Sequence, residues 1–177
     1  MKPKNQNTLT YILFTIYFLL LIGIIIFKLP FYSEVLSDGV RVINLIPFQG
    51  SFDSGGIIDF REIRDNILIF VPFGIYLCML KNQWSFIKKT ISIIGLTLTF
   101  EIIQFIFAIG RTDITDIIGN TLGGIIGIAI YALLFWVLKD KTNKVINMLA
   151  LIVTVCVVIW FARLFYLSHF VMRGLRP

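Results

Sequence analysis

Long apolar runs separated by short polar segments dominate the chain, and this pattern predicts an all-α protein that crosses a membrane several times. About 20 apolar residues in a helix span the hydrocarbon core of a bilayer. Helices pair every backbone group within one segment, and the pattern lacks the two-residue alternation of a membrane barrel. We therefore expect a polytopic transmembrane helical bundle with about five spans, at approximately residues 9–27, 66–80, 86–109, 114–138 and 145–167.

The first apolar run follows two lysines, as the apolar region of a secretory signal peptide would. It is longer than that region usually is, and no small-residue cleavage site follows it, so we expect an uncleaved first span. The chain is 58% hydrophobic, against about 45–50% for soluble domains. Its 177 residues predict a single membrane domain over 1–177.

The distribution of basic residues predicts the orientation of the bundle. With the N-terminus in the cytoplasm, a short tail and two short loops on the inner side carry Lys2, Lys4, Lys81, Lys88, Lys89, Lys139, Lys141 and Lys144. The positive-inside rule weighs such short segments most strongly, so we expect a multi-pass plasma-membrane protein with its C-terminus outside. The arginines fall outside or within spans, and their planar guanidinium groups suit phosphate and carboxylate.

Composition also narrows the classes of partner. The formal net charge is +6, yet no compact stripe of Lys and Arg with interleaved aromatic residues indicates a nucleic-acid groove. We therefore expect membrane lipids, and no nucleic acid, as partners. Cys78 and Cys156 lie inside apolar runs without the spacing of a zinc site, and we expect no cofactor.

Residues 101–124 gather polar side chains where the third and fourth predicted spans meet. Glu101 and Gln104 are three residues apart and share one face of the third helix. Glu101 would lie roughly 12 Å below the end of that helix, at about 1.5 Å per residue. A carboxylate at that depth is costly and normally faces the bundle interior or a wet cavity. On the fourth helix, Asp116 and Asn120 are four residues apart and again share a face.

Small residues and proline predict how the helices pack. Gly119, Gly123 and Gly127 step by four, which makes a ridge that permits close approach of a neighbouring helix. In the second span, Pro72 and Gly74 indicate a kink that frees a backbone carbonyl.

The connection between the first and second spans is the longest outside the apolar runs. It contains an apolar cluster with proline at 44–48, followed by a Gly- and Ser-rich loop at 50–56. Charged residues then lead into the second span, where we expect Asp65 or Asn66 to cap the helix.

Together these positions predict a polar pocket open to the outer face, lined by Arg64, Asn66, Glu101, Gln104, Arg111, Asp113, Asp116 and Asn120. Simpler structural roles compete with this hypothesis. Glu101 would pair with Arg111 or Arg64 to hold the bundle, and Asp116 would complement a helix dipole. The three amide side chains would link helices by hydrogen bonds, and Arg111 would only contact headgroups.

Three segments in order resemble the VanZ-like membrane protein family: NLIPF at 44–48, RDNILIFVPFG at 64–74 and EIIQFIFAIGRTDITDIIGNTLGGIIG at 101–127. The resemblance covers about residues 42–130, and its third segment is the most specific. The family pattern falls here on Asn44, Pro47, Phe48, Arg64, Asn66, Pro72, Gly74, Glu101, Gln104, Arg111, Asp116, Asn120 and Gly123. The family takes its name from a protein associated with teicoplanin resistance, so the resemblance implies an envelope protein linked to glycopeptide tolerance.

Three classes of function fit these residues. The first is an envelope module whose arginines bind an anionic lipid headgroup, a cell-wall lipid precursor or a lipoglycopeptide. The second is an intramembrane enzyme acting on a lipid-linked phosphate, with a divalent cation held by Glu101, Asp113 and Asp116. No histidine and no nucleophile with an adjacent base accompany these carboxylates, which favours a non-enzymatic role. The third is a transporter or a purely structural bundle.

Overall fold

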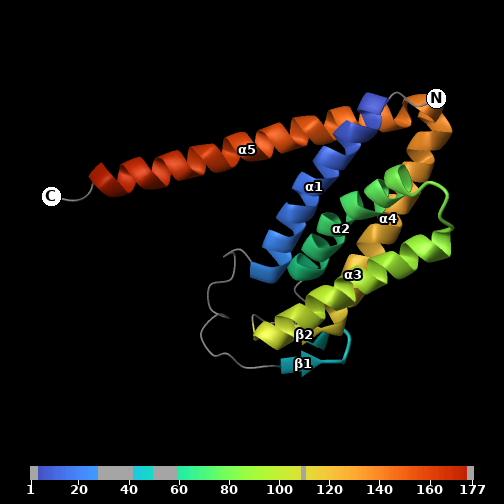
Figure 1. The fold of residues 1–177 in the computed structure, drawn as a ribbon. Coiled ribbons are helices and arrows are strands. Elements are labelled where there is room, and N and C mark those ends of the chain that lie inside the picture. Colours follow the sequence, from blue (N-terminus) through green and yellow to red (C-terminus); the bar gives the residue numbers. More distant parts are fainter. Residues whose placement is uncertain (1–3, 28–41, 50–59, 109–110, 175–177) are drawn as a thin grey trace.

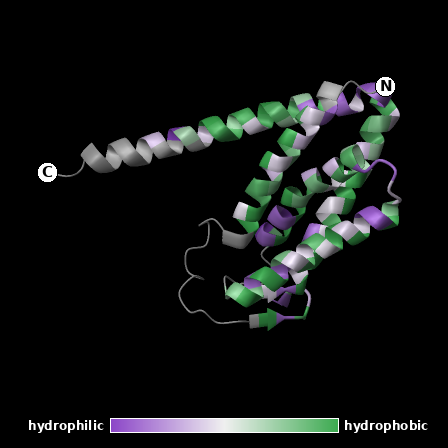
Figure 2. Cartoon of the chain, in the orientation of Figure 1, coloured by the Kyte–Doolittle hydropathy of each residue, from purple (hydrophilic) through white to green (hydrophobic). Residues whose placement is uncertain are grey.

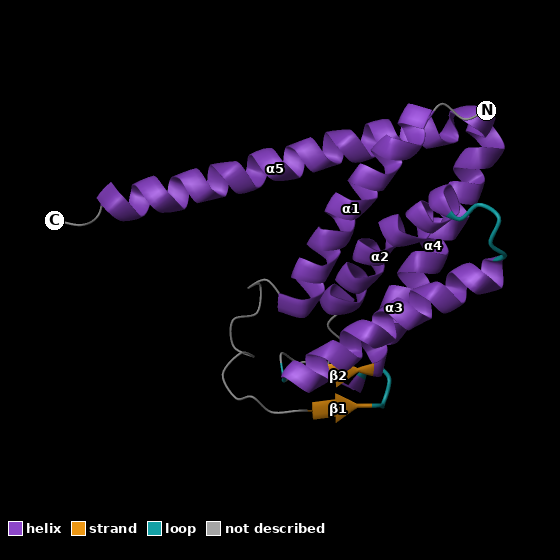
Figure 3. Cartoon of the chain, in the orientation of Figure 1, coloured by secondary structure: helices purple, strands orange, loops and turns teal. Residues whose placement is uncertain are grey.

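The computed structural model describes residues 4–27, 42–49, 60–108 and 111–174, and it confirms an almost entirely helical bundle (Figure 1). Two short strands accompany the helices (Figure 3). In chain order the elements are α1 (Lys4–Phe27), β1 (Val42–Asn44), α2 (Phe60–Leu80), α3 (Phe86–Phe107), β2 (Arg111–Asp113), α4 (Ile114–Leu138), the 3₁₀ turn η3 (Lys139–Lys141) and α5 (Thr142–Gly174).

Four helical stretches in the described part of the chain are long and apolar enough to cross a membrane, one fewer than the five predicted. They are Asn7–Ile25, Phe60–Leu80, Phe86–Phe107 and Ile114–Trp160. The predicted fourth and fifth spans form one continuous stretch because no loop separates them at 139–144. That segment contains no glycine or proline, and the buried Thr142 hydroxyl donates a 2.7 Å hydrogen bond to the Lys139 carbonyl. The chain therefore turns by one 3₁₀ turn.

The turn between α4 and α5, hereafter the elbow (139–144), redirects the last helix. In Figure 1, α5 runs past the N-terminal end of α1 and away from the bundle instead of returning alongside α4. A buried pair fixes its first part: Thr10 on α1 and Asn147 on α5 exchange hydrogen bonds of 2.8 and 3.2 Å. Beyond this pair the described side chains of α5 are mostly exposed and apolar (Figure 2).

Glycines bring α2 and α4 into backbone contact, as the spacing of the ridge predicted. A Cβ atom added at Gly123 would overlap the carbonyl of Ile67, and one at Gly127 would overlap that of Val71. In the opposite direction, a Cβ atom at Gly74 of α2 would overlap the backbone of α4. Van der Waals contact drives helix association in lipid, so this pairing is the structural centre of the bundle.

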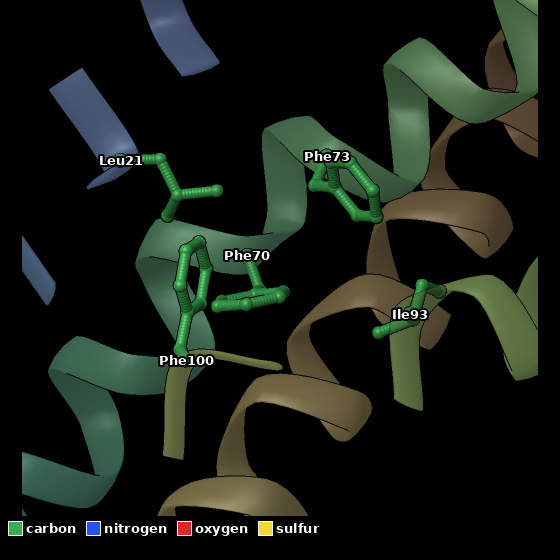
Figure 4. Close-up of a cluster of buried hydrophobic side chains, with 5 residues drawn as sticks. All are labelled: Leu21, Phe70, Phe73, Ile93 and Phe100. Carbon is green, nitrogen blue, oxygen red and sulfur yellow. The ribbon is translucent and has the colours of Figure 1, made fainter. Parts of the chain in front are cut away.

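Aromatic and aliphatic side chains fill the space between α1, α2 and α3. The buried cluster consists of Leu21, Phe70, Phe73, Ile93 and Phe100 (Figure 4). Phe70 and Phe100 meet edge to face with ring centroids 6.4 Å apart. On α1, the Tyr17 hydroxyl donates a 2.7 Å hydrogen bond to the Ile69 carbonyl, next to the Leu68 carbonyl that Pro72 cannot pair.

One local prediction is wrong, and one short element was not predicted. The second helix begins at Phe60, six residues before the predicted start, so Asp65 and Asn66 lie inside it and neither caps it. Its first turn carries the acidic Glu62, which favours the helix dipole and allows a polar segment to be helical. The short connection between the predicted third and fourth spans contains strand β2, which pairs in parallel with β1. Strands of three residues are too short to show an alternating pattern.

Candidate functional site

The two strands, the segment 45–49 and the adjoining ends of α2, α3 and α4 form one end of the bundle, hereafter the hairpin end (Figure 1). Helix α3 stops at Ala108, whose left-handed backbone (φ 52°) turns the chain while its N–H bonds the last turn. Helix α4 starts after Asp113. Between them, β2 pairs with β1 in the register Val42 with Arg111 and Asn44 with Asp113.

Glu101 holds the strand β2 against the end of α3. Its side chain is only 3% exposed, and its Oε2 accepts a 3.0 Å hydrogen bond from the backbone N–H of Asp113. The Thr112 hydroxyl donates to the backbone carbonyl of Glu101 at 3.3 Å. A buried carboxylate in a membrane helix therefore fixes the backbone of the hairpin tip.

Asp113 links the start of α4 to strand β1. Its Oδ1 accepts a 2.8 Å hydrogen bond from the N–H of Thr115, which caps the helix, and its Oδ2 accepts one of 2.8 Å from Nδ2 of Asn44. The carboxylate thus satisfies a helix N–H and a side-chain amide at once. The contact with Asn44 was not predicted from the sequence, because that residue lies 69 positions away.

The segment 45–49 is bound to the same helix start. Ile46 donates its N–H to Oδ1 of Asn44 at 3.2 Å, and Phe48 donates its N–H to the Thr115 hydroxyl at 2.9 Å. Phe48 has a φ of 65°, a left-handed conformation uncommon outside glycine. Although hydrogen bonds fix the backbone of this segment, its side chains are exposed and mainly apolar: Leu45, Ile46, Pro47 and Phe48.

A second set of polar side chains joins the helices below the hairpin tip. Asn66 on α2 donates a 2.7 Å hydrogen bond to Oδ1 of the buried Asp116. Asn120 on α4 donates one of 2.8 Å to the Thr97 hydroxyl on α3. Gln104 on α3 donates one of 2.9 Å to the Ile25 carbonyl on α1.

Each of these amides connects two different helices, so each takes part in packing. Gln104 Oε1 and Asn120 Oδ1 are buried and have no hydrogen-bond partner among the described residues. Packing alone therefore does not use the full hydrogen-bonding capacity of the two amides. The sequence did not point to Thr97, Thr112 and Thr115, because a single hydroxyl side chain gives no periodic signal.

The structure describes the side chain of one arginine predicted to line the pocket, Arg64, but only the backbone of the other, Arg111. Arg64 lies at the surface of α2 and pairs with the adjacent Asp65 at 2.8 Å, both side chains being about 60% exposed. It is thus directed to the surface of the bundle. The backbone of Arg111 begins β2, three residues before α4, and its side chain lies outside the described part of the structure. The predicted pocket itself remains a prediction.

The carboxylates of the hairpin end do not make a recognisable metal centre. Glu101, Asp113 and Asp116 come from neighbouring elements, but no group of three His, Cys, Asp or Glu side chains in the described ranges is arranged to hold a metal ion. The described bonds of Asp113 go to nitrogen donors of the protein. The hydrogen bonds of Asp113 therefore favour a structural role for this carboxylate over coordination of a metal ion.

These features define a polytopic membrane protein with a buried polar network at one end of a close-packed helical hairpin. The sequence profile of the VanZ/LLP1 family matches residues 14–137, and the chain belongs to that family. The match contains the whole network and ends before the elbow, so α5 lies beyond it.

One curated relative supports the same assignment. Protein VanZ from Enterococcus faecium is 43% identical over 122 residues, which are 68% of this chain and 72% of the relative. No solved structure matches the chain.

Proposed function

We propose that the protein acts at the cell envelope by binding an anionic amphiphile at its hairpin end. The candidate ligands are an anionic lipid headgroup, a cell-wall lipid precursor and a lipoglycopeptide. Arg111 would contact the phosphate or carboxylate, because a guanidinium group makes paired, charge-assisted hydrogen bonds with such anions. Glu101 and Asp113 would position the strand that carries it.

One observation carries this proposal: the buried carboxylate of Glu101 holds the strand of Arg111 through the N–H of Asp113 at 3.0 Å. Burying a carboxylate in a membrane helix is costly, and such residues usually serve a function. Here the carboxylate fixes a three-residue strand whose first residue is an arginine. Rigid supporting residues around a binding group reduce the entropy lost on binding.

The exposed apolar side chains beside the strand support an amphiphilic ligand over a purely polar one. Leu45 is 70% exposed and Ile46 59%, on a backbone held by Asn44 and Thr115. An arginine on a strand that pairs with the strand before this apolar segment would suit a headgroup followed by a hydrocarbon chain. Membership of the VanZ/LLP1 family makes the lipoglycopeptide teicoplanin the first ligand to test.

The proposal places the hairpin end outside the cell and the N-terminus in the cytoplasm. The concentration of lysines at the opposite end of the bundle supports this orientation. In a cysteine-free background, a membrane-impermeant maleimide should label Gln49→Cys in intact cells and Asn82→Cys only after permeabilisation. The reverse pattern would refute the orientation.

Expression in a teicoplanin-susceptible host tests the role of the hairpin end. We expect the wild type to raise the teicoplanin concentration that inhibits growth, and Arg111→Ala and Asp116→Asn to return it to the level of the empty vector. Arg163→Ala removes an exposed arginine from α5 and should behave as wild type. Full tolerance in cells that contain normal amounts of the Arg111→Ala protein in the membrane would contradict the proposal.

The alternative of an intramembrane enzyme makes a different prediction. Purified protein would then hydrolyse or transfer an undecaprenyl-type phosphate in a reaction that requires a divalent cation. If the purified protein binds the amphiphile but shows no turnover with any of a series of metals, the enzyme alternative is refuted and the binding role stands.

A further inference from the structure

The end of the bundle opposite the hairpin end carries a concentration of lysines. They come from two segments far apart in the sequence: the turn 81–85 between α2 and α3 with the first turn of α3, and the elbow. The residues are Lys81, Lys88, Lys89, Lys139, Lys141 and Lys144. All are exposed except Lys89, which is half-buried, and Asp140 is the single acid within residues 81–90 and 139–144. We name this surface the lysine end.

Contacts between helices combine the two segments into one surface. The Tyr131 hydroxyl on α4 donates a 3.0 Å hydrogen bond to Oδ1 of Asn143 in the elbow. A buried cluster packs the end of α2 against the start of α5 through Tyr76, Met79 and Ile146. Figure 2 shows the hydrophilic segments together at this end.

The lysine end lies directly at the edge of the hydrocarbon-facing surface. The Lys81 ammonium lies 5.4 Å from the centre of the Trp84 ring, and tryptophan favours the headgroup layer of a bilayer. Immediately beyond the lysines, Ile91 is 62% exposed and Trp136 is 71% exposed. We therefore expect the lysine ammonium groups to lie near the level of the lipid phosphate groups.

The elbow holds its lysines on an unusual backbone. Lys139 has a φ of 50° and a ψ of −125°, a backbone conformation that few residues other than glycine adopt. The buried Thr142 accounts for this turn through its bond to the Lys139 carbonyl. The protein therefore keeps a tight, fixed turn at a point where three lysines lie within six residues, although positive charges this close repel one another.

We propose that the lysine end binds the headgroup of an anionic phospholipid from the adjoining leaflet, with the phosphate between the turn 81–85 and the elbow. Six cations beside a single acid need counter-charge, and a phospholipid supplies it from within the membrane. The surrounding exposed apolar residues accommodate its acyl chains. A basic surface between transmembrane helices is a recurrent site for such headgroups. The proposal is independent of the ligand at the hairpin end.

Native mass spectrometry of the full chain, released from bilayers that contain equal amounts of phosphatidylglycerol and phosphatidylcholine, tests this inference. We expect phosphatidylglycerol to be retained in preference to phosphatidylcholine. The variant Lys141→Gln/Lys144→Gln should weaken its binding at least about tenfold, from the contribution of each lysine near an anionic surface. The variant Lys141→Arg/Lys144→Arg should retain binding.

The control with the same change in net charge is Arg163→Glu, which lowers the charge by two at an exposed position of α5 outside the lysine end and should leave retention unchanged. Equal retention of the two lipids by the wild type would overturn the proposal. An equal loss in the control would also overturn it, because the effect would then follow net charge alone. Displacement of the lipid by inorganic phosphate at constant ionic strength would show a site for free phosphate instead.

Discussion

At the scale of single residues, Glu101 and Asp113 determine the geometry of the hairpin end. Each uses a carboxylate oxygen to satisfy a backbone N–H at a helix boundary, Glu101 for Asp113 and Asp113 for Thr115. A charged acceptor strengthens such a bond, and low dielectric strengthens it further. The sequence predicted both acids as lining residues of a pocket, but it did not reveal the hydrogen bonds that each makes to other parts of the chain.

The contact between Asp113 and Asn44 predicts a measurable coupling. Asp113→Ala should lower the free energy of unfolding by about 2 kcal/mol, because it removes the helix cap and leaves the Asn44 amide without this acceptor. Asn44→Ala should cost about 1 kcal/mol. The double variant should cost less than the sum by about 0.5–2 kcal/mol, as measured by unfolding in mixed micelles.

Thr99→Ala is the control for this pair of substitutions, because Thr99 is exposed and its hydroxyl, within the described part of the chain, bonds the Gly95 carbonyl of its own helix. We expect it to be neutral and to combine additively with Asp113→Ala. Strict additivity of Asn44→Ala and Asp113→Ala would show that the contact between strand and helix contributes nothing to stability.

At the scale of elements, the helices were predictable because long apolar runs are a strong signal. The glycine ridge was predictable too, since its four-residue step permits close packing only on one face of α4. The strands β1 and β2 were not, because their pairing depends on a contact between residues 69 positions apart. The start of α2 was also missed, since the segment before residue 66 is polar and therefore does not extend the apolar run, although it is helical and has an acidic first turn.

Close packing of α2 on α4 predicts contrasting effects of adding one methyl group. Gly123→Ala should destabilise the protein by about 1–3 kcal/mol, because the new Cβ atom overlaps the Ile67 carbonyl and forces two backbones apart. Gly95→Ala places its Cβ atom in open space and should be neutral or stabilising by up to about 1 kcal/mol. Thermal unfolding of the two purified variants, followed by circular dichroism, makes the comparison.

Equal stability of these two variants would contradict backbone contact between α2 and α4. The comparison is well matched, since both glycines lie inside apolar helices and both changes raise helix propensity equally. Only the space around the added atom differs.

At the scale of the whole molecule, the chain has two chemically distinct ends. Carboxylates, amides and the strand of Arg111 form the hairpin end, while lysines form the other. This division was predictable from the sequence, because lysines and arginines separate along the chain. The direction of α5 was not, because a lysine-bearing segment without glycine or proline does not reveal whether it forms a loop or a helical turn. The family match, which ends at residue 137, covers the bundle that carries the site.

Equilibrium binding of a fluorescent teicoplanin to the purified protein in lipid nanodiscs tests whether the hairpin end binds an amphiphile through Arg111. We expect saturable binding to the wild type. We also expect at least about tenfold weaker binding by Arg111→Ala, since loss of a charge-assisted hydrogen bond costs about 1.5–3 kcal/mol, and wild-type binding by Arg163→Ala. Binding that is equally strong in wild type and Arg111→Ala, or no greater than that of empty nanodiscs, would contradict the proposal.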